Sequence, residues 1–386
     1  MEKVKIGIVG IGNIGSLHMR NVLGGELMNA ELVALCDINP DKLKRIRDEY
    51  GNRFELYDDV DELLADPNID AIIVSTPHYD HPVIAIKGIK AGKHVLVEKP
   101  AGVYTKKVRE MIEESKKHPE ITLSLVYNQR MNPTYQKAKE LVESGQIGEL
   151  RRTNWIITNW YRSQSYYDSG GWRATWKGEG GGVLLNQDPH QLDLWQWICG
   201  MPARIFSFAY YGKRREVEVE TEVTAYCEYA NGATGVFVTT TTETPGTNRF
   251  EIVGSQGKIV IEDEQLKFWR TVVDEDEWNR TYKGGFGEPE TWEIKIPVTF
   301  DGSTGHLRVT QNFVNNILFG EKLVAPVTDG IYGLSISNAI HLSSWQQRWV
   351  ELPIDEELFL TELNHRIEGS QVKSVEEKVL DTENTY

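Results

Sequence analysis

The chain has 386 residues, a formal net charge of −15, and a composition that is 40% hydrophobic and 26% charged. This composition is that of a soluble globular protein, and the length predicts two or three domains at about 150 residues each. The acidic balance argues against a nucleic acid or an anionic membrane as partner, because those surfaces attract an excess of Lys and Arg.

The cysteines and the N-terminus favour a reducing compartment. Cys36, Cys199 and Cys227 are widely separated, so neither a disulfide framework nor a zinc cluster is expected. No apolar run approaches the roughly 18 residues that a membrane span requires. Residues 1–10 lack a signal-peptide pattern and predict a first strand, so we expect a cytoplasmic protein with no membrane partner.

Short apolar runs alternate with helical stretches through the first third of the chain. Strands are predicted at residues 4–9, 32–36, 71–75, 94–97 and 121–126. Helices are predicted after residue 15 and at residues 41–50, 82–90 and 105–117. Continuous apolar strands separated by helices indicate a parallel sheet covered on both faces. We therefore expect an α/β, doubly wound, dinucleotide-binding Rossmann domain over residues 1–127.

The pattern changes after a predicted helix at residues 133–143. Strands rich in Thr, Val, Tyr and Trp are predicted at residues 150–160, 204–211, 217–229, 234–242, 250–253, 257–262, 266–269 and 292–297. They indicate a large, mostly antiparallel open sheet, with helices returning at 306–318 and 333–349. Residues 128–367 are thus expected to form an α+β domain. The acidic residues 368–386 are expected to be a loose tail or an arm on another subunit.

The first site signal is a glycine-rich turn between the first strand and the first helix. Gly10, Gly12 and Gly15 fit G-x-G-x-x-G, with Asn13 and Ile14 inside the motif. The first glycine permits the turn, the second lets a pyrophosphate approach the backbone, and the third lets helix and strand pack closely. Free N–H groups at the helix N-terminus attract the anion, so we expect these residues to bind a dinucleotide.

Asp37 closes the second strand. Its carboxylate can accept hydrogen bonds from both adenosine ribose hydroxyls, and its charge would repel a 2′-phosphate. NAD is therefore favoured over NADP, although Asn39 and Lys42 leave some use of NADP open.

The ends of later strands carry the second site signal. Lys99, in Glu98-Lys99-Pro100, lies on the ligand-binding edge of a parallel sheet. It is either a solvated strand-end lysine or a group that takes a hydroxyl proton or holds the substrate oxygen. For His78 and His81, packing or cofactor contact is favoured over metal binding, and no metal site is predicted. The residues expected along the cofactor edge are Ser75, Thr76, His78, His81, Glu98 and Lys99.

A glycine run followed by a histidine carries the third site signal. Residues 180–182 are all glycine, which marks a tight approach of the backbone to another group. Asn186, His190 and Asp193 would share one face of a continuous helix. Pro189 leaves two alternatives: it begins a helix capped by Asp188, with Asn186 outside, or it kinks a longer helix. Beside the glycine run, a catalytic histidine is favoured over a buried structural one.

Aromatic residues and arginines around the glycine run suggest a substrate wall. Sugar rings stack their C–H faces on aromatic rings, while guanidinium groups meet the hydroxyls. For Trp155, Trp195 and Trp197 a place in the core or an interface is favoured. The residues expected to contact substrate are Tyr161, Arg162, Trp172, Arg173, Asn186 and His190. An acidic sugar remains open through the arginines.

Together these motifs resemble the Gfo/Idh/MocA oxidoreductases, in order along the chain to about residue 350. The motifs that carry the resemblance are Gly10-x-Gly12-x-x-Gly15, Thr76-Pro77-x-x-x-His81, Gly92-Lys93-His94-Val95-x-x-Glu98-Lys99-Pro100, residues 180–193 and Asp329-Gly330. The resemblance implies NAD or NADP, redox chemistry at a secondary carbon of a sugar or cyclitol, and a homodimer or homotetramer formed through the open sheet. It also implies that Lys99 is a catalytic lysine and that His190 exchanges a proton with the substrate hydroxyl.

The chain departs from this family at Asn186, where its inositol dehydrogenases carry aspartate. A carboxylate–histidine dyad is therefore absent there, and Asp193 or Asp188 is expected to support the His190 ring instead. These changes resemble the branch that oxidises sugars or glycosides, often at C3. In the expected mechanism His190 takes the hydroxyl proton, Lys99 stabilises the oxygen and Asn186 orients substrate or histidine.

Three functions are therefore weighed. The leading hypothesis is an NAD-dependent sugar, glycoside or cyclitol dehydrogenase. The second is cleavage of a glycoside through transient oxidation at C3, with NAD recycled. The third is a non-enzymatic NAD-binding sensor, against which the presence of both Lys99 and His190 argues.

Overall fold

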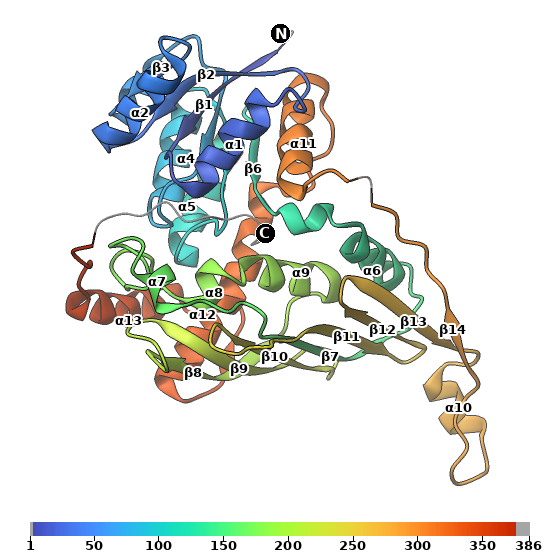
Figure 1. Ribbon diagram of the computed structural model, residues 1–386. Coiled ribbons are helices and arrows are strands. Elements are labelled where there is room, and N and C mark those ends of the chain that lie inside the picture. The colour runs from blue at the N-terminus through green and yellow to red at the C-terminus, as the bar shows by residue number, and fades with distance from the viewer. Residues whose placement is uncertain (1–2, 301, 376–386) are drawn as a thin grey trace.

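A parallel sheet of six strands forms the N-terminal layer of the computed structural model, which describes residues 3–300 and 302–375 (Figure 1). In pairing order its strands are β3 (Glu55–Tyr57), β2 (Ala30–Cys36), β1 (Val4–Val9), β4 (Ala71–Val74), β5 (His94–Val97) and β6 (Leu123–Leu125). The connecting helices are α1 (Asn13–Leu23), α2 (Pro40–Tyr50), α3 (Val60–Ala65), α4 (Asp80–Lys90) and α5 (Thr105–Lys117). The chain reverses its winding between β1 and β4, where doubly wound sheets bind ligands. The expected Rossmann fold is confirmed.

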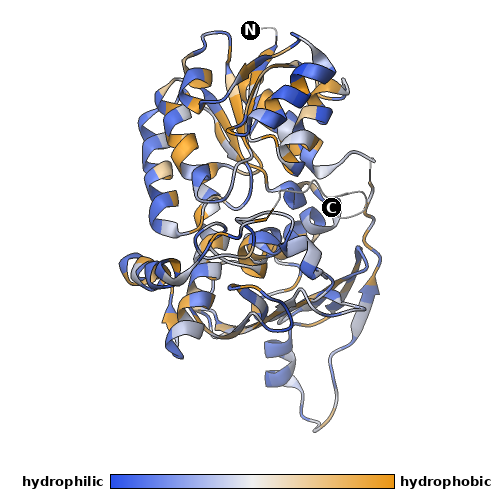
Figure 2. Cartoon of the chain, turned by 60° about the vertical axis from the view of Figure 1, so that its left-hand side comes forward, coloured by the Kyte–Doolittle hydropathy of each residue, from blue (hydrophilic) through white to orange (hydrophobic). Residues whose placement is uncertain are grey.

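The strands of this sheet are buried because they are apolar on both faces. Ile6, Ile8, Ile72 and Val95 have no exposed surface. Figure 2 shows the same contrast, with hydrophobic strands inside and helices whose outer sides are hydrophilic. Such runs fit a parallel sheet that is covered by helices on both sides.

A second, mixed sheet of nine strands forms the opposite layer (Figure 1). In pairing order its strands are β14 (Thr291–Ile294), β13 (Gln265–Thr271), β12 (Gly257–Glu262), β11 (Asn248–Gly254), β7 (Leu150–Ile157), β10 (Thr234–Thr240), β9 (Glu220–Glu228), β8 (Arg204–Tyr211) and β15 (Val350–Glu351). Among the described residues, neighbouring strands of this sheet pair antiparallel, except β7 with β10, which are parallel. The expected mostly antiparallel sheet is confirmed.

Helices α6 (Pro133–Glu143), α9 (Pro189–Cys199) and α12 (Gly330–Gln346) lie between the two sheets (Figure 1). Trp155 and Trp195, expected in the core, are 0% and 1% exposed. The remaining helices are α7 (Gln164–Tyr167), α8 (Val183–Asn186), α10 (Glu275–Thr281), α11 (Gly305–Phe319) and α13 (Glu356–Gly369), with short 3-10 turns η1 (Asn128–Met131) and η2 (Val327–Asp329).

Helix α11 returns to the Rossmann layer from the second half of the chain. Its Val309, Phe313 and Val314 belong to the same buried cluster as Ile6 and Ile8 of β1. A helix outside residues 1–127 thus completes the packing of the first sheet. The division of the chain at residue 127 stays a prediction.

The segment after α13 packs on the same chain. The Lys373 N–H donates to the Gly171 carbonyl over 2.9 Å, and its ammonium donates to the Tyr167 carbonyl over 3.0 Å. Ser370 donates to Glu218 at 2.5 Å. The expected tail therefore begins as an attached segment, while residues 376–386 of that prediction lie outside the described residues.

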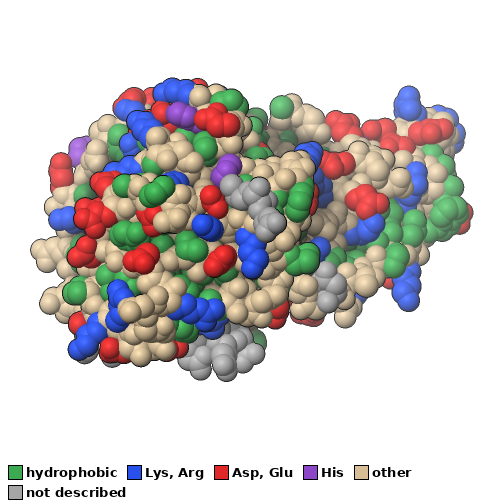
Figure 3. All heavy atoms as spheres, turned by 90° about the horizontal axis from the view of Figure 1, so that it is seen from above, with side chains coloured by type: hydrophobic (Ala, Val, Ile, Leu, Met, Phe, Trp, Pro, Cys, Tyr) green, Lys and Arg blue, Asp and Glu red, His purple; other side chains and the backbone are tan. Residues whose placement is uncertain are grey.

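An arm projects from the edge of the second sheet. It contains α10 and leads into β14, and it extends beyond the sheet layer (Figure 1). Phe286 is fully exposed and Trp292 is 55% exposed. Seen from above, hydrophobic side chains gather at this end of the molecule, whereas acidic and basic groups intermix over the rest of that face (Figure 3).

A buried arginine joins the layers. Arg130, in η1, is 1% exposed and donates two hydrogen bonds to Asp193 of α9, at 2.7 and 2.6 Å. A third, to Asp329 in η2, spans 2.6 Å. Burial disfavours the guanidinium charge, but the two carboxylates raise the pKa of Arg130 and keep it charged. Asp193 is thereby fully engaged and does not support His190, so that expectation was wrong.

Candidate active site

The glycine turn has the shape that a pyrophosphate requires. Gly10 has φ +94°, and a Cβ there would lie 2.7 Å from the Ser75 carbonyl oxygen. A Cβ on Gly15 would overlap the Gly10 carbonyl, whereas a Cβ on Gly12 would meet no protein atom within 4 Å. No side chain caps the N-terminus of α1. The open space at Gly12 and the uncapped N–H groups at Asn13 and Ile14 therefore fit an anionic dinucleotide.

Asp37 is held at the end of β2 by the backbone. Its carboxylate accepts the Ile11 N–H over 2.7 Å and the Asn39 N–H over 2.9 Å. The Lys42 ammonium lies 3.4 Å away. These contacts fix the carboxylate beside the glycine turn, where an adenosine ribose would meet it.

The residues after β4 shape the turn beside the cofactor edge. Ser75 donates to the carbonyls of Val9 and Gly10, at 3.1 and 2.8 Å. Both ring nitrogens of His81 face carbonyl oxygens, those of Pro100 at 2.7 Å and Thr76 at 2.8 Å. His81 therefore ties the Thr76 turn to the segment after Lys99, and its direct contact with a cofactor stays a prediction.

His78 faces the second domain. Its Nδ1 lies 3.1 Å from the carbonyl oxygen of Glu179, and its ring meets that of Trp172 edge-on at 5.8 Å. Burial, with the charges of His81 and Lys99, lowers the pKa of His78 well below its usual value. A neutral ring therefore fills the junction between the cofactor edge and the expected substrate wall.

Glu98 supports the backbone beneath Lys99. It is 2% exposed, its Oε1 lies 2.7 Å from His18 Nε2, and its Oε2 accepts the Lys99 N–H over 3.1 Å. Burial alone would raise the pKa of Glu98, but the hydrogen bond and charge of His18 lower it to about 2. Glu98 is thus a buried anion close to Lys99.

Lys99 connects the two domains. Its ammonium donates a 2.8 Å hydrogen bond to the backbone carbonyl of Asn186, at the end of α8. Burial lowers the pKa of Lys99, and the Glu98 carboxylate opposes this effect. The lysine therefore lies at the carboxyl end of β5, with its cation directed at the glycine–histidine segment.

His190 lies in the first turn of α9. It is 9% exposed, its ring meets Tyr127 edge-on at 6.4 Å, and its Nδ1 has no hydrogen-bond partner among the residues that the structure describes. Burial and then the Lys99 charge lower its pKa well below the usual value. The imidazole is therefore neutral near pH 7 and can accept a proton.

The first of the two alternatives for Pro189 is correct. Pro189 begins α9, and Asn186 ends the separate helix α8. Asp188 occupies the N-cap position, but its side chain makes no capping bond. It is fully buried, and burial raises its pKa to about 8. The side chains of Thr239 and Trp160 lie beside its carboxylate and oppose this rise, and the described residues show no contact between Asp188 and His190. The expectation that Asp188 supports His190 was therefore also wrong.

The glycine run approaches protein atoms from both domains. Gly180 has φ +83°, and a Cβ there would overlap the Val103 side chain. A Cβ on Gly182 would overlap the Glu220 carbonyl. The Glu220 carboxylate also accepts the N–H groups of Gly182 and Leu184, at 2.9 and 3.0 Å. These contacts fix the start of α8 and therefore the position of Asn186.

Tyr166, which sequence reasoning missed, is the centre of the expected substrate wall. Its hydroxyl donates to Asn186 Oδ1 over 3.2 Å and accepts from Arg173 over 3.0 Å. The guanidinium carbons of Arg162 and Arg173 lie 5.1 and 4.8 Å from the centre of its ring. Tyr161 lies apart: it is 48% exposed and its ring faces Arg215.

Two further residues, Gln187 and Glu179, were also missed. Gln187 donates to the Tyr166 hydroxyl over 3.2 Å, and Glu179 accepts from the Asn186 amide. Only the position of Glu179 directly before the glycine run could have signalled it. The structure thus brings Lys99, Asn186, Arg162 and Arg173 into one network of neighbours.

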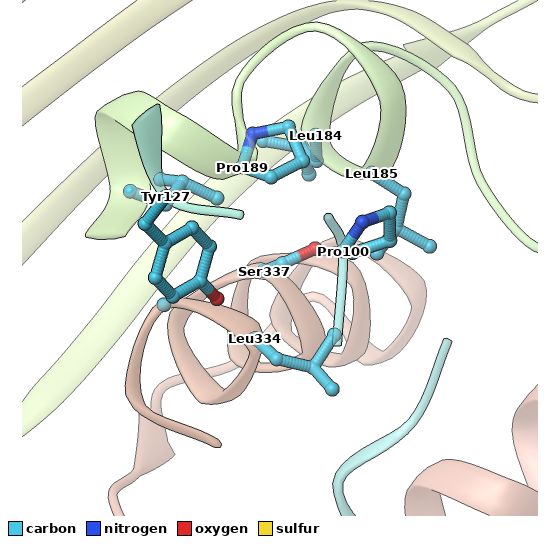
Figure 4. A pocket seen from close by; sticks show the side chains of 9 residues that line it. Pro100, Tyr127, Leu184, Leu185, Pro189, Leu334 and Ser337 are labelled. Atoms are coloured by element: carbon cyan, nitrogen blue, oxygen red, sulfur yellow. The ribbon is translucent and has the colours of Figure 1, made fainter. Parts of the chain in front are cut away.

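A small cavity lies behind this network, where the domains meet (Figure 4). Its volume of about 10 Å³ leaves room for at most about one water molecule, which is too small for a sugar. Side chains from both domains and from α12 point into it in Figure 4, including Pro100, Tyr127, Leu185 and Leu334. This apolar contact packs Pro100 against α8 and so supports the position of Lys99.

Two family models match the chain in succession. Residues 4–126 match the oxidoreductase family with the NAD-binding Rossmann fold, and residues 135–260 match the GFO/IDH/MocA C-terminal domain. The chain belongs to the Gfo/Idh/MocA oxidoreductase family. It is therefore an enzyme of the NAD-binding oxidoreductase type, as its motifs predict.

The matches to several relatives extend over nearly the whole length of this oxidoreductase. Myo-inositol 2-dehydrogenase of Thermotoga maritima is 27% identical over 90% of this chain and 98% of its own. Levoglucosan dehydrogenase of Pseudarthrobacter phenanthrenivorans is 25% identical over 92% and 99%. The WlbA dehydrogenase of Bordetella pertussis, solved with NADH and UDP-GlcNAcA, has a TM-score of 0.76 and 25% identity over 92% of this chain and 100% of its own. Among the described residues, no helix of this oxidoreductase has the length and apolarity to cross a bilayer.

Alanine substitutions at Gly12 and Gly15 should fail in different ways. Gly12 has extended backbone angles and free space, so Gly12→Ala should keep the wild-type melting temperature and lose at least about tenfold in NADH affinity (about 1.4 kcal/mol). Gly15→Ala should lower the melting temperature, because its Cβ overlaps the Gly10 carbonyl. Thermal unfolding and NADH fluorescence titration measure the two effects. Unchanged NADH affinity in Gly12→Ala would contradict the assigned site.

The titration of His190 should show its burial and its lysine neighbour. Its pKa is depressed, so the neutral ring should persist below pH 6.5, its ordinary titration range, and charge only in more acidic solution. Lys99→Met removes a cation and should raise this pKa. Histidine NMR, with the His190 signal assigned from His190→Asn, measures both. A midpoint that is near 6.5 in the wild type and insensitive to Lys99→Met would count against their proximity.

Proposed function

We propose that this oxidoreductase is an NAD-dependent dehydrogenase for a secondary alcohol of a sugar, glycoside or cyclitol. The observation that carries the proposal is the 2.8 Å hydrogen bond from Lys99 to Asn186, because it brings the end of the cofactor-binding sheet to the segment that bears His190. When bound, NAD supplies the hydride acceptor; the protein supplies position, charge and a proton acceptor.

His190, Lys99 and Asn186 have different roles in the reaction. The neutral His190 imidazole takes the hydroxyl proton while the carbinol hydrogen leaves as hydride, so that a ketone, reduced cofactor and imidazolium result. The Lys99 ammonium stabilises negative charge on the reacting oxygen. Asn186 orients the substrate through its side chain and holds Lys99 through its backbone carbonyl.

The substrate wall supports a polyhydroxylated ring. The guanidinium groups of Arg162 and Arg173 lie over the rings of Tyr166 and Trp172, so aromatic side chains and guanidinium donors stand together there. Named relatives act on inositols and levoglucosan, which are compounds of this kind. The two arginines also make an acidic sugar a substrate to include in any test.

Turnover with a substrate panel tests the proposal. Inositols, hexoses, uronic acids and glycosides are incubated with NAD or NADP, and reduced cofactor is read at its absorbance maximum. We expect signal with one class and NAD, and a loss of at least about 100-fold in Lys99→Ala and His190→Ala. Product analysis separates glycoside cleavage through transient oxidation, which leaves no net NADH. NADH binding without turnover or cleavage would favour the sensor hypothesis.

We further infer a cytoplasmic homo-oligomer that pairs through the open sheet. The outward positions of β8 and β9 expose Phe208, Tyr210 and Tyr226, at 48%, 47% and 38%. The free cysteines Cys36 and Cys227 are buried and require no oxidising compartment. Light scattering should give at least twice the 44.0 kDa of one chain, and Phe208→Arg should lower that mass. A wild-type mass of one chain would contradict the pairing.

A further inference from the structure

A buried carboxylate lies against the side chain of Asn186. The Asn186 amide donates to Oε1 of Glu179. Glu179 is 2% exposed, and its Oε2 accepts the Ala174 N–H over 2.5 Å. Glu179 lies immediately before the glycine run at residues 180–182, and one of its carboxylate oxygens thus contacts Asn186 while the other contacts the backbone of Ala174.

We propose that Glu179 is the positioning carboxylate of this active site and acts through Asn186. The Asn186 side chain connects Glu179 to the substrate wall, since its NH₂ group contacts Glu179 and its oxygen accepts from Tyr166. The inference rests on the proposed function, because it assigns a role at the same site.

The hydrogen bonds fix how Asn186 is turned. Burial raises the pKa of Glu179, while the Arg173 charge and the hydrogen bonds from Ala174 and Asn186 oppose this rise and favour the ionised form. An ionised carboxylate can only accept, so Glu179 binds the NH₂ group of the Asn186 side chain. The side-chain oxygen then faces the other way, where it accepts from Tyr166 at 3.2 Å and Gln187 at 3.1 Å. With a neutral partner that can also donate, the amide would be free to turn over. Glu179 therefore keeps an acceptor oxygen on the Tyr166 side.

Glu179 also balances charge around Lys99. Lys99, Arg162 and Arg173 bring three cations to the site, and the Glu179 carboxylate acts to raise the pKa of Lys99 whereas both arginines act to lower it. Burying a cation is costly unless an anion lies close by. Glu98 supplies one such anion below Lys99, and Glu179 supplies the second from the opposite domain.

The test substitutes Glu179 and Asn186, first singly and then together. Glu179→Gln should lower kcat by about 10- to 100-fold, the range for a lost hydrogen bond to a charged group. Asn186→Asp restores the residue of the inositol dehydrogenases but sets two carboxylates against each other, so it should also lose kcat. The double variant Glu179→Gln/Asn186→Asp restores one carboxylate and one amide in contact and should recover at least tenfold over either single variant.

A second readout does not depend on turnover. The pKa of Lys99, measured by pH-dependent acylation and mass spectrometry, should fall in Glu179→Gln and return towards the wild-type value in the double variant. Glu218→Gln is the matched control: Glu218 binds the Trp176 N–H of the same loop and does not contact Asn186, so kcat and the pKa of Lys99 should stay unchanged.

The outcomes separate the two proposals. Absence of turnover in the wild type would overturn the proposed function, while the pKa of Lys99 would still decide the role of Glu179. Full kcat in Asn186→Asp, or a double variant no better than Glu179→Gln, would overturn the role of Glu179. If Glu179→Gln does not fold, Asn186→Asp decides alone, because it leaves the contact of Glu179 with Ala174 in place.

Discussion

The buried guanidinium of Arg130 is the constraint on which the arrangement of the site depends. It follows the last strand of the parallel sheet, yet its partners are Asp193 on α9 and Asp329 before α12. Because a buried cation without its carboxylates is strongly unfavourable, α9 cannot shift without breaking these bonds. His190 lies three residues before Asp193 on the same helix. The Arg130 contact therefore sets where the imidazole lies relative to the Rossmann sheet.

Lys99 makes the second connection between the two domains, and this connection lies within the candidate active site. Arg130 joins the layers through the buried Asp193 and the partly buried Asp329, whereas Lys99 binds a backbone carbonyl beside half-buried side chains. Glycines in the 180–182 run allow this, since side chains there would collide with Val103 or Glu220. The close approach that the glycines predict is therefore a contact between two segments of the protein itself. It is also what brings α8 close enough to the lysine.

The sequence predicts the fold well and the site only in part. β1, β5, α5 and α6 match the predicted bounds, because each is a strong periodic or apolar run with a clear end. β3, α3, α10 and α13 were not predicted: β3 has three residues, α3 and α10 have only six and seven, and α13 is charged. The glycine motif, Lys99 and His190 were found because local chemistry marks them.

The partners of those residues were not predicted, because they depend on contacts between distant segments. Asp193 has the helical spacing to serve His190, but Arg130, 63 residues away in sequence, occupies it. In the sequence Glu179 resembles any acidic loop residue. Only the folded structure shows that it is buried against Asn186. A sequence pattern cannot show which carboxylate will pair with a buried cation.

The balance of charge explains why a neutral histidine can serve as the proton acceptor here. Burial lowers the pKa of Lys99 and the nearby anions oppose this effect, with Glu98 held ionised by His18. Asp188 is fully buried, and burial raises its pKa to about 8, which favours the uncharged acid. Proton transfer to His190 would add a further cation to those of Lys99, Arg162 and Arg173. The Glu98 and Glu179 carboxylates offset that charge, so the site contains the anions that proton uptake requires before the substrate arrives.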